Sequence, residues 1–98
     1  MSYRLLIRKR AELQITEAYI WYETKQLNLG NDFLSSIEDS LNIINLNPQA
    51  FQLKYKHIRA VYIKHFPYGI FYSVEQDKII VMAVFHLSRN PKFWKKLK

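Results

Sequence analysis

Three side chains near two predicted strand ends have the chemistry needed to act on a phosphodiester. Lys64 lies near the end of one strand, His86 ends the last strand, and Arg89 follows three residues later. Cations bind phosphate and stabilise the charge that develops during phosphoryl transfer. Histidine donates or accepts a proton near neutral pH. The sequence does not give the strand register, so it leaves open whether the three side chains meet.

A second set of basic residues suits binding rather than catalysis. Lys54, Lys56 and Arg59 lie along a predicted strand, and Lys92 and Trp94 belong to the basic, aromatic end of the chain. Such residues can dock an acidic protein or a nucleic acid, with the indole as an apolar anchor. The alternative is structural, with the indole packed on the core and the terminal lysines solvated.

Several classes of site are disfavoured by composition. The chain has no cysteine, which excludes disulfides and thiolate chemistry. It has two glycines, too few for a glycine-rich phosphate loop. The histidines at 57, 65 and 86 lack the spacing of metal ligands. We therefore expect no metal and no cofactor.

Length and charge predict one small basic domain spanning residues 1–98. The 98 residues carry a net charge of +7. Residues 1–49 hold five Lys/Arg and six acids, a balance of −1, whereas residues 50–98 hold ten Lys/Arg and two acids, a balance of +8. A surface of this kind attracts phosphate or acidic protein. No apolar run approaches the roughly 20 residues that span a bilayer, so we expect a cytoplasmic protein.

Hydrophobic periodicity predicts a strand followed by two helices. Residues 2–9 alternate as in a strand, and residues 10–26 then carry apolar residues at helical spacing. Gly30 is expected to stop the first helix, with Asn31 or Asp32 capping a second. The second helix should end before Pro48. The short break predicts an antiparallel helical hairpin.

From residue 51 the period becomes two, which predicts three further strands. The runs "IRAVYIKHF", "YGIFYSV" and "IIVMAVF" are separated by the short turns "FPYG" and "EQDK". The turns predict an antiparallel meander. The predicted fold is therefore α+β, in the order β-α-α-β-β-β, with the helical hairpin covering one face of an antiparallel sheet. The other face is expected to carry many of the cations and no second layer.

Two combined motifs resemble the RelE/ParE family of type II toxins. They are "FPYGIFY" and "AVFHLSRNP", and "WYE", "LG" and "NP" favour the ParE-like, plasmid-stabilisation branch. The resemblance covers nearly the whole chain. It implies a bacterial toxin neutralised by a cognate antitoxin, whose flexible segment wraps the toxin. We expect that segment to be acidic and amphipathic, to meet the basic half of the chain.

The resemblance implies two alternative activities. ParE-like members poison DNA gyrase by binding, and we favour this interpretation. RelE-like members are endoribonucleases that cut mRNA on the ribosome, and His86, Arg89 and Lys64 would then be catalytic. Phe93 and Trp94 stand where that branch has a tyrosine, and neither has a phenolic hydroxyl. A third alternative is a non-toxic member that only binds antitoxin.

Overall fold

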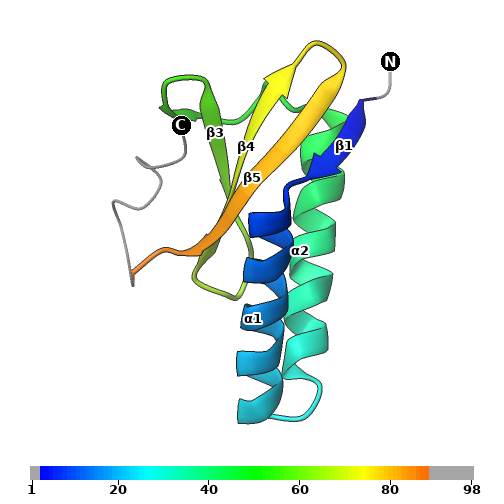
Figure 1. Ribbon diagram of the computed structural model, residues 1–98. Coiled ribbons are helices and arrows are strands. Elements are labelled where there is room, and N and C mark those ends of the chain that lie inside the picture. The colour runs from blue at the N-terminus through cyan, green and yellow to red at the C-terminus, as the bar shows by residue number, and fades with distance from the viewer. Residues whose placement is uncertain (1–2, 89–98) are drawn as a thin grey trace.

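The two helices pair because each carries an apolar stripe that only a shared partner can bury. The computed structural model describes residues 3–88, in which α1 (Lys9–Lys25) and α2 (Leu29–Leu46) run antiparallel and side by side (Figure 1). Ala11 and Ala18 are the buried residues of α1, and their small side chains let the helix lie close to its neighbours. Neither helix is long and apolar enough to cross a membrane within this described range.

The prediction that Gly30 stops a helix is wrong, because Gly30 lies in the first turn of α2. A Cβ atom there would approach the Tyr19 carbonyl oxygen within 2.8 Å, so the glycine allows the helices to come together. Asn28, and neither Asn31 nor Asp32, is the N-cap of α2. The Glu23 carboxylate accepts the backbone N–H groups of Asn28 and Gly30, each at 2.9 Å. The carboxylate that accepts hydrogen bonds from the first N–H groups of α2 therefore comes from α1.

The helical hairpin covers one face of a five-stranded sheet in the order β1-β5-β4-β3-β2. The strands are β1 (Arg4–Ile7), β2 (Leu53–Tyr55), β3 (Ile58–Tyr62), β4 (Tyr68–Glu75) and β5 (Lys78–His86). The predicted α+β class and the β3-β4-β5 meander are confirmed. The sheet is mixed rather than wholly antiparallel, since β1 pairs in parallel with β5. The sequence predicted only three strands after the helices, so the short β2 is an additional strand.

Four aromatic rings join the helical hairpin to the turn between β3 and β4. Tyr22 and Phe33 come from the helices, and Phe66 and Tyr68 come from the turn and the start of β4. Their ring centroids lie 4.8–6.1 Å apart, mostly in edge-to-face arrangements. Such pairs add roughly 0.5–1.5 kcal/mol each beyond the burial of their area. The cluster therefore fixes this end of the sheet under the helices.

The centre of the second face, which was predicted to carry many of the cations, is apolar. Its buried residues come from β3, β4 and β5. They are Ile58, Ala60, Phe71, Met82, Ala83 and Phe85. The apolar residues of "IIVMAVF" fall on both sides of β5, as in strands that are buried on both faces.

A β-bulge in β5 changes which side chains face the helices. Phe71 pairs with Ala83 but Tyr72 pairs with Val81, so Met82 is the extra residue. Val81 and Val84 both belong to the cluster under the helices. The Val84 N–H donates to the Gln14 side-chain oxygen of α1 at 2.7 Å. The bulge therefore places the next alternate residue, His86, on the helix side of the sheet.

A buried phenol ties the segment after α2 to the sheet. The Tyr72 hydroxyl donates to the Pro48 carbonyl at 2.6 Å, and the ring is fully buried. The Arg59 guanidinium donates to the Phe51 carbonyl at 2.6 Å. Burial raises the pKa of Tyr72 to about 12, against a smaller opposing effect of Arg59. These two bonds hold residues 48–51 beside β3 and β4.

Replacing Tyr72 with Phe should lower the free energy of unfolding at pH 8 by about 1–3 kcal/mol, because the Pro48 carbonyl loses its donor. The folded pKa of Tyr72 lies above that of the unfolded chain, so its neutral form stabilises the fold below pH 10. That contribution should disappear as the pH rises from 10 to 12. Urea unfolding of both proteins from pH 8 to 12 measures it. Parallel losses of stability in wild type and Tyr72→Phe would contradict the assignment.

Candidate functional site

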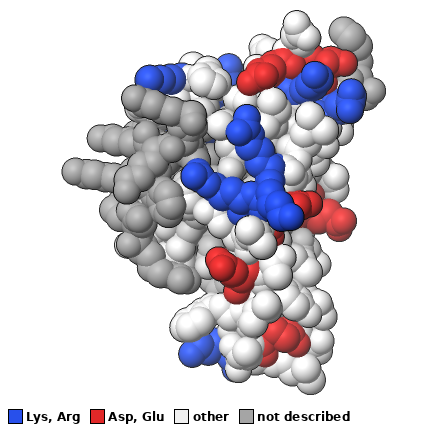
Figure 2. Space-filling view, viewed as in Figure 1, with Lys and Arg blue, Asp and Glu red and all other residues white. Residues whose placement is uncertain are grey.

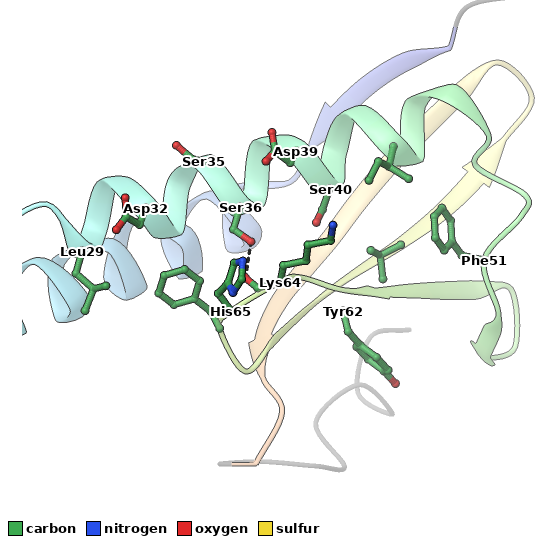
Figure 3. A pocket seen from close by; sticks show the side chains of 13 residues that line it. Leu29, Asp32, Ser35, Ser36, Asp39, Ser40, Phe51, Tyr62, Lys64 and His65 are labelled. Atoms are coloured by element: carbon green, nitrogen blue, oxygen red, sulfur yellow. Dashed lines mark hydrogen bonds between the residues drawn. The ribbon is translucent and has the colours of Figure 1, made fainter.

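A groove of about 620 Å³ runs between α2 and the outer side of β3 (Figure 3). Apolar side chains from both elements and from the adjoining segments line it, with polar groups along the helix and the turn. Its lining includes Asp32, Ser36 and Asp39 of α2 and, on the side of the sheet, Val61, Tyr62 and Lys64. The groove has an apolar lining with polar groups at its sides, as ligand and peptide sites commonly do.

The helix side of the groove is acidic and rich in hydroxyl groups. Asp32, Ser35 and Asp39 follow a spacing of three and four residues, which places them along one side of α2. The opposite side carries Lys64 and His65. The groove therefore presents charges of opposite sign on its two sides.

Lys64 is held in the groove through its backbone. The Ser36 hydroxyl of α2 donates to the Lys64 carbonyl at 2.7 Å (Figure 3). The next residue, His65, has a φ of 71°, in the left-handed region that non-glycine residues seldom adopt. In Figure 3 the Lys64 side chain extends along the groove on the side of α2 that carries Ser40. The Ser36 hydroxyl therefore holds the backbone at Lys64, where the chain turns after β3.

His86 reaches the same end of the sheet as Lys64 but has different surroundings. Tyr68 of β4 pairs with His86 and also accepts the Ile63 N–H, so β4 lies between the two strand ends. Two strand spacings amount to about 10 Å. The imidazole packs edge-on against the Tyr68 ring, with centroids 5.2 Å apart, and its Nδ1 accepts the Ser88 N–H at 3.2 Å.

The three residues predicted as catalytic are thus brought together only in part. Lys64 lines the groove, whereas His86 is absent from its lining and packs against β4. Arg89 lies outside the described residues. Within residues 3–88, no three His, Asp or Glu side chains are grouped so that they could hold a metal ion.

The predicted binding residues occupy two different settings. Lys54 lies over the Tyr62 ring at 5.4 Å, and Lys56 lies over the Tyr55 ring at 5.3 Å. Each is a cation–π pair on the β2–β3 hairpin. Arg59 instead uses its guanidinium internally, on the Phe51 carbonyl. Lys92 and Trp94 lie outside the described residues.

Basic side chains also gather where α1 begins. Arg8, Lys9 and Arg10 are consecutive there, with Glu12 as the acid of the first turn. Figure 2 shows Lys and Arg side chains over this part of the molecule, with acidic side chains nearby. In the described part of the chain, positive charge is therefore not confined to the C-terminal half.

Sequence reasoning missed the acidic side of the groove. In the sequence, Asp32 is only a candidate N-cap and Asp39 has no assigned role. Their shared spacing with Ser35 was the available signal. This spacing indicates one side of a groove only once β3 is known to lie opposite α2.

Comparisons with known proteins agree with this architecture. The family described as "ParE toxin of type II toxin-antitoxin system, parDE" matches residues 5–91. Toxin ParE2 of Mycobacterium tuberculosis is 30% identical over 95 residues, covering 93% of this chain and 88% of the relative.

Two solved structures have a similar fold. One is described as the chromosomal ParDE TA system from P. aeruginosa, with a TM-score of 0.64, 13% identity and coverage of 86% of this chain and 95% of that chain. The other is a mutant of the E. coli toxin RelE in the free state, with a TM-score of 0.67, 14% identity and coverage of 96% and 93%.

Replacing Ser36 with Ala should lower the free energy of unfolding by about 1 kcal/mol, because the Lys64 carbonyl loses its donor. The neighbouring Ser35→Ala is the matched control, since Ser35 is exposed, and it should change stability by less than about 0.5 kcal/mol. Urea unfolding of both variants measures the difference. Equal effects would mean that the Ser36 bond does not hold the turn.

Proposed function

Because this chain belongs to the ParE toxin family of type II toxin–antitoxin systems, we propose that it inhibits DNA gyrase by binding to it. The toxin role and the existence of an antitoxin partner follow from the family. The gyrase target is the proposal, and it requires the cytoplasmic location that we expect from the sequence.

The observation that carries the proposal is the separation of the Lys64 and His86 side chains. Proton transfer requires the acid or base within hydrogen-bond reach of the reacting group. His86 instead packs on Tyr68 and contacts Ser88, while Lys64 lies in the groove beside α2. Over residues 3–88 this arrangement favours a protein that acts by binding.

Lys54 and Lys56 are the residues we propose for the gyrase-binding surface. Both lie on the β2–β3 hairpin beside tyrosine rings, and Tyr62 is 53% exposed. Tyrosine and cationic groups are suited to protein interfaces, where a ring supplies area and a cation supplies steering. Lys92 and Trp94 are included in the proposed surface on the sequence alone. Arg59 would contribute indirectly, because its hydrogen bond to the Phe51 carbonyl holds residues 48–51 in place.

Purified protein free of antitoxin should block supercoiling by gyrase and increase the amount of cleaved DNA. The double variant Lys54→Glu/Lys56→Glu should reduce this inhibition by about tenfold, because the charge of the surface is reversed. Lys25→Glu is the matched control, since Lys25 also lies over an aromatic ring, that of Trp21, but at the far end of α1. Normal supercoiling in excess toxin would refute the proposal.

Ribosome-dependent cleavage of mRNA is the second candidate function. It is supported by the position of His86 and Lys64 at one end of the sheet, on either side of Tyr68. Repositioning of either side chain when RNA binds would bring an imidazole and a cation to one phosphate. Arg89 would be the third member of this site.

A translation extract supplied with the protein distinguishes the two functions. If the protein is a ribonuclease, mRNA should be cut within codons, and His86→Ala should reduce cutting at least 100-fold, a typical loss on removing a general acid or base. His57→Ala is the control, because His57 is an exposed residue of the β2–β3 turn. Intact message with the wild-type protein would eliminate this function and leave the binding function standing.

A further inference from the structure

Leu13 and Ile20 of α1 point away from the core, although both side chains are large and apolar. They are 55% and 53% exposed. Leu13 follows the buried Ala11 by two residues, and Ile20 follows the buried Ala18 in the same way. Two residues turn a helix by about 200°, so Leu13 and Ile20 lie on the side of α1 opposite its packed side. A surface helix normally carries polar residues there.

These two residues belong to a longer row on α1, which we call the outer stripe. It consists of Lys9, Leu13, Thr16, Ile20 and Glu23. The spacings alternate between four and three residues, the pattern by which one helix packs along another. Lys9 and Thr16 are exposed as well, so no element within residues 3–88 covers the stripe from its start to Ile20.

The outer stripe has room for the side chains of a second helix. A hollow of about 400 Å³ lies on this side of α1, and Lys9, Leu13 and Thr16 are among its lining residues. In Figure 1 the helical hairpin extends beyond the end of the sheet, so another helix can approach this part of α1 without meeting the strands. The surface is therefore open to a partner helix.

Charge indicates which helix fits the outer stripe. The stripe begins with a cation, Lys9, and ends with a carboxylate, that of Glu23. These two residues lie seven positions before and seven after Thr16, while Leu13 and Ile20 lie three before and four after it. The same helix running in the reverse direction therefore meets each charge with its opposite and each apolar side chain with another. A second copy of α1 is such a helix.

The Glu23 carboxylate has a fixed position for such a contact. It accepts the backbone N–H groups of Asn28 and Gly30, each at 2.9 Å, which holds it at the end of the stripe. Figure 2 shows basic side chains over the start of α1 and acidic side chains farther along the hairpin. Glu17 opposes the pairing, since two copies of this carboxylate approach each other beside Thr16. We therefore expect a weak association.

We propose that two copies of the chain associate through α1 in antiparallel orientation, with Leu13 of each copy packed against Ile20 of the other and Lys9 beside Glu23. Such a twofold contact uses the same surface of both copies. Burial of the apolar side chains supplies affinity, and the charge pair sets the direction. The surface is separate from the groove and from the β2–β3 hairpin, so the inference does not depend on the gyrase target.

Sedimentation velocity of the antitoxin-free protein tests the contact. The average mass should rise from that of one chain toward that of two as the concentration is raised through the micromolar range. Ile20→Glu should weaken the association about tenfold or more, because it places a carboxylate in the apolar part of the contact. Ile43→Glu is the matched control: Ile43 is 48% exposed on α2, outside the stripe, and its variant should stay within about twofold of wild type. Circular dichroism checks that both variants are folded.

Charge reversal of Lys9 tests the direction of the second helix in the same measurement. Lys9→Glu should weaken the association about fivefold or more, because the new carboxylate faces Glu23 of the second copy. Arg4→Glu is the control, since Arg4 is exposed on β1, and it should change the association by less than about twofold. Both substitutions lower the net charge by the same amount. If only general repulsion between the copies mattered, both variants would associate more tightly.

The outcomes separate the parts of the proposal. A protein that stays monomeric at every concentration, or equal losses in Ile20→Glu and Ile43→Glu, would overturn the contact through α1. Unchanged or tighter association of Lys9→Glu would overturn the antiparallel order alone. Inhibition of gyrase is measured independently, so this inference and the proposed function fail separately.

Discussion

Contacts among the rings of Tyr22, Phe33, Phe66 and Tyr68 fix the part of the molecule on which its function depends. Two of these rings come from the helical hairpin and two from the turn and strand opposite. Packing of this kind sets the distance between α2 and β3 and therefore the width of the groove. It also brings the Lys64 carbonyl to the Ser36 hydroxyl and presents the Tyr68 ring to His86.

The same end of the sheet shows how a local irregularity decides chemistry. Met82 adds one residue to β5, and the Gln14 side chain accepts the Val84 N–H on that strand. Without the extra residue, the alternation of side chains would send His86 to the opposite face of the sheet. Its contact with Tyr68, and its separation from Lys64 by β4, both follow from this bulge.

The distribution of charge suits a protein that recognises other proteins. The groove has aspartates along α2 and Lys64 on the opposite side. The β2–β3 hairpin adds lysines beside exposed or half-buried tyrosines. Opposite charges placed on two sides of one groove fix the orientation and register of a bound chain more than they raise its affinity. A toxin that must be held by an antitoxin benefits from such selectivity.

The sequence by itself determined the class of fold, the helical hairpin and the β3-β4-β5 meander, because these follow from hydrophobic periodicity and short turns. It also determined the family, through motifs that lie close together along the chain. It misplaced the start of α2, since the reason for Gly30 is its contact with Tyr19 on another helix. It also missed the parallel pairing of β1 with β5, which joins residues more than 70 positions apart.

The candidate site was decided only by the tertiary structure. Lys64 and His86 were recognised by residue type, but their surroundings depend on register, on the bulge at Met82 and on the packing of α2. For Asp32 and Asp39, the sequence held only their shared spacing with Ser35, which does not by itself indicate a groove. A groove forms between segments far apart in sequence, and local periodicity cannot encode the distance between them. That distance is set by side-chain packing in the assembled core.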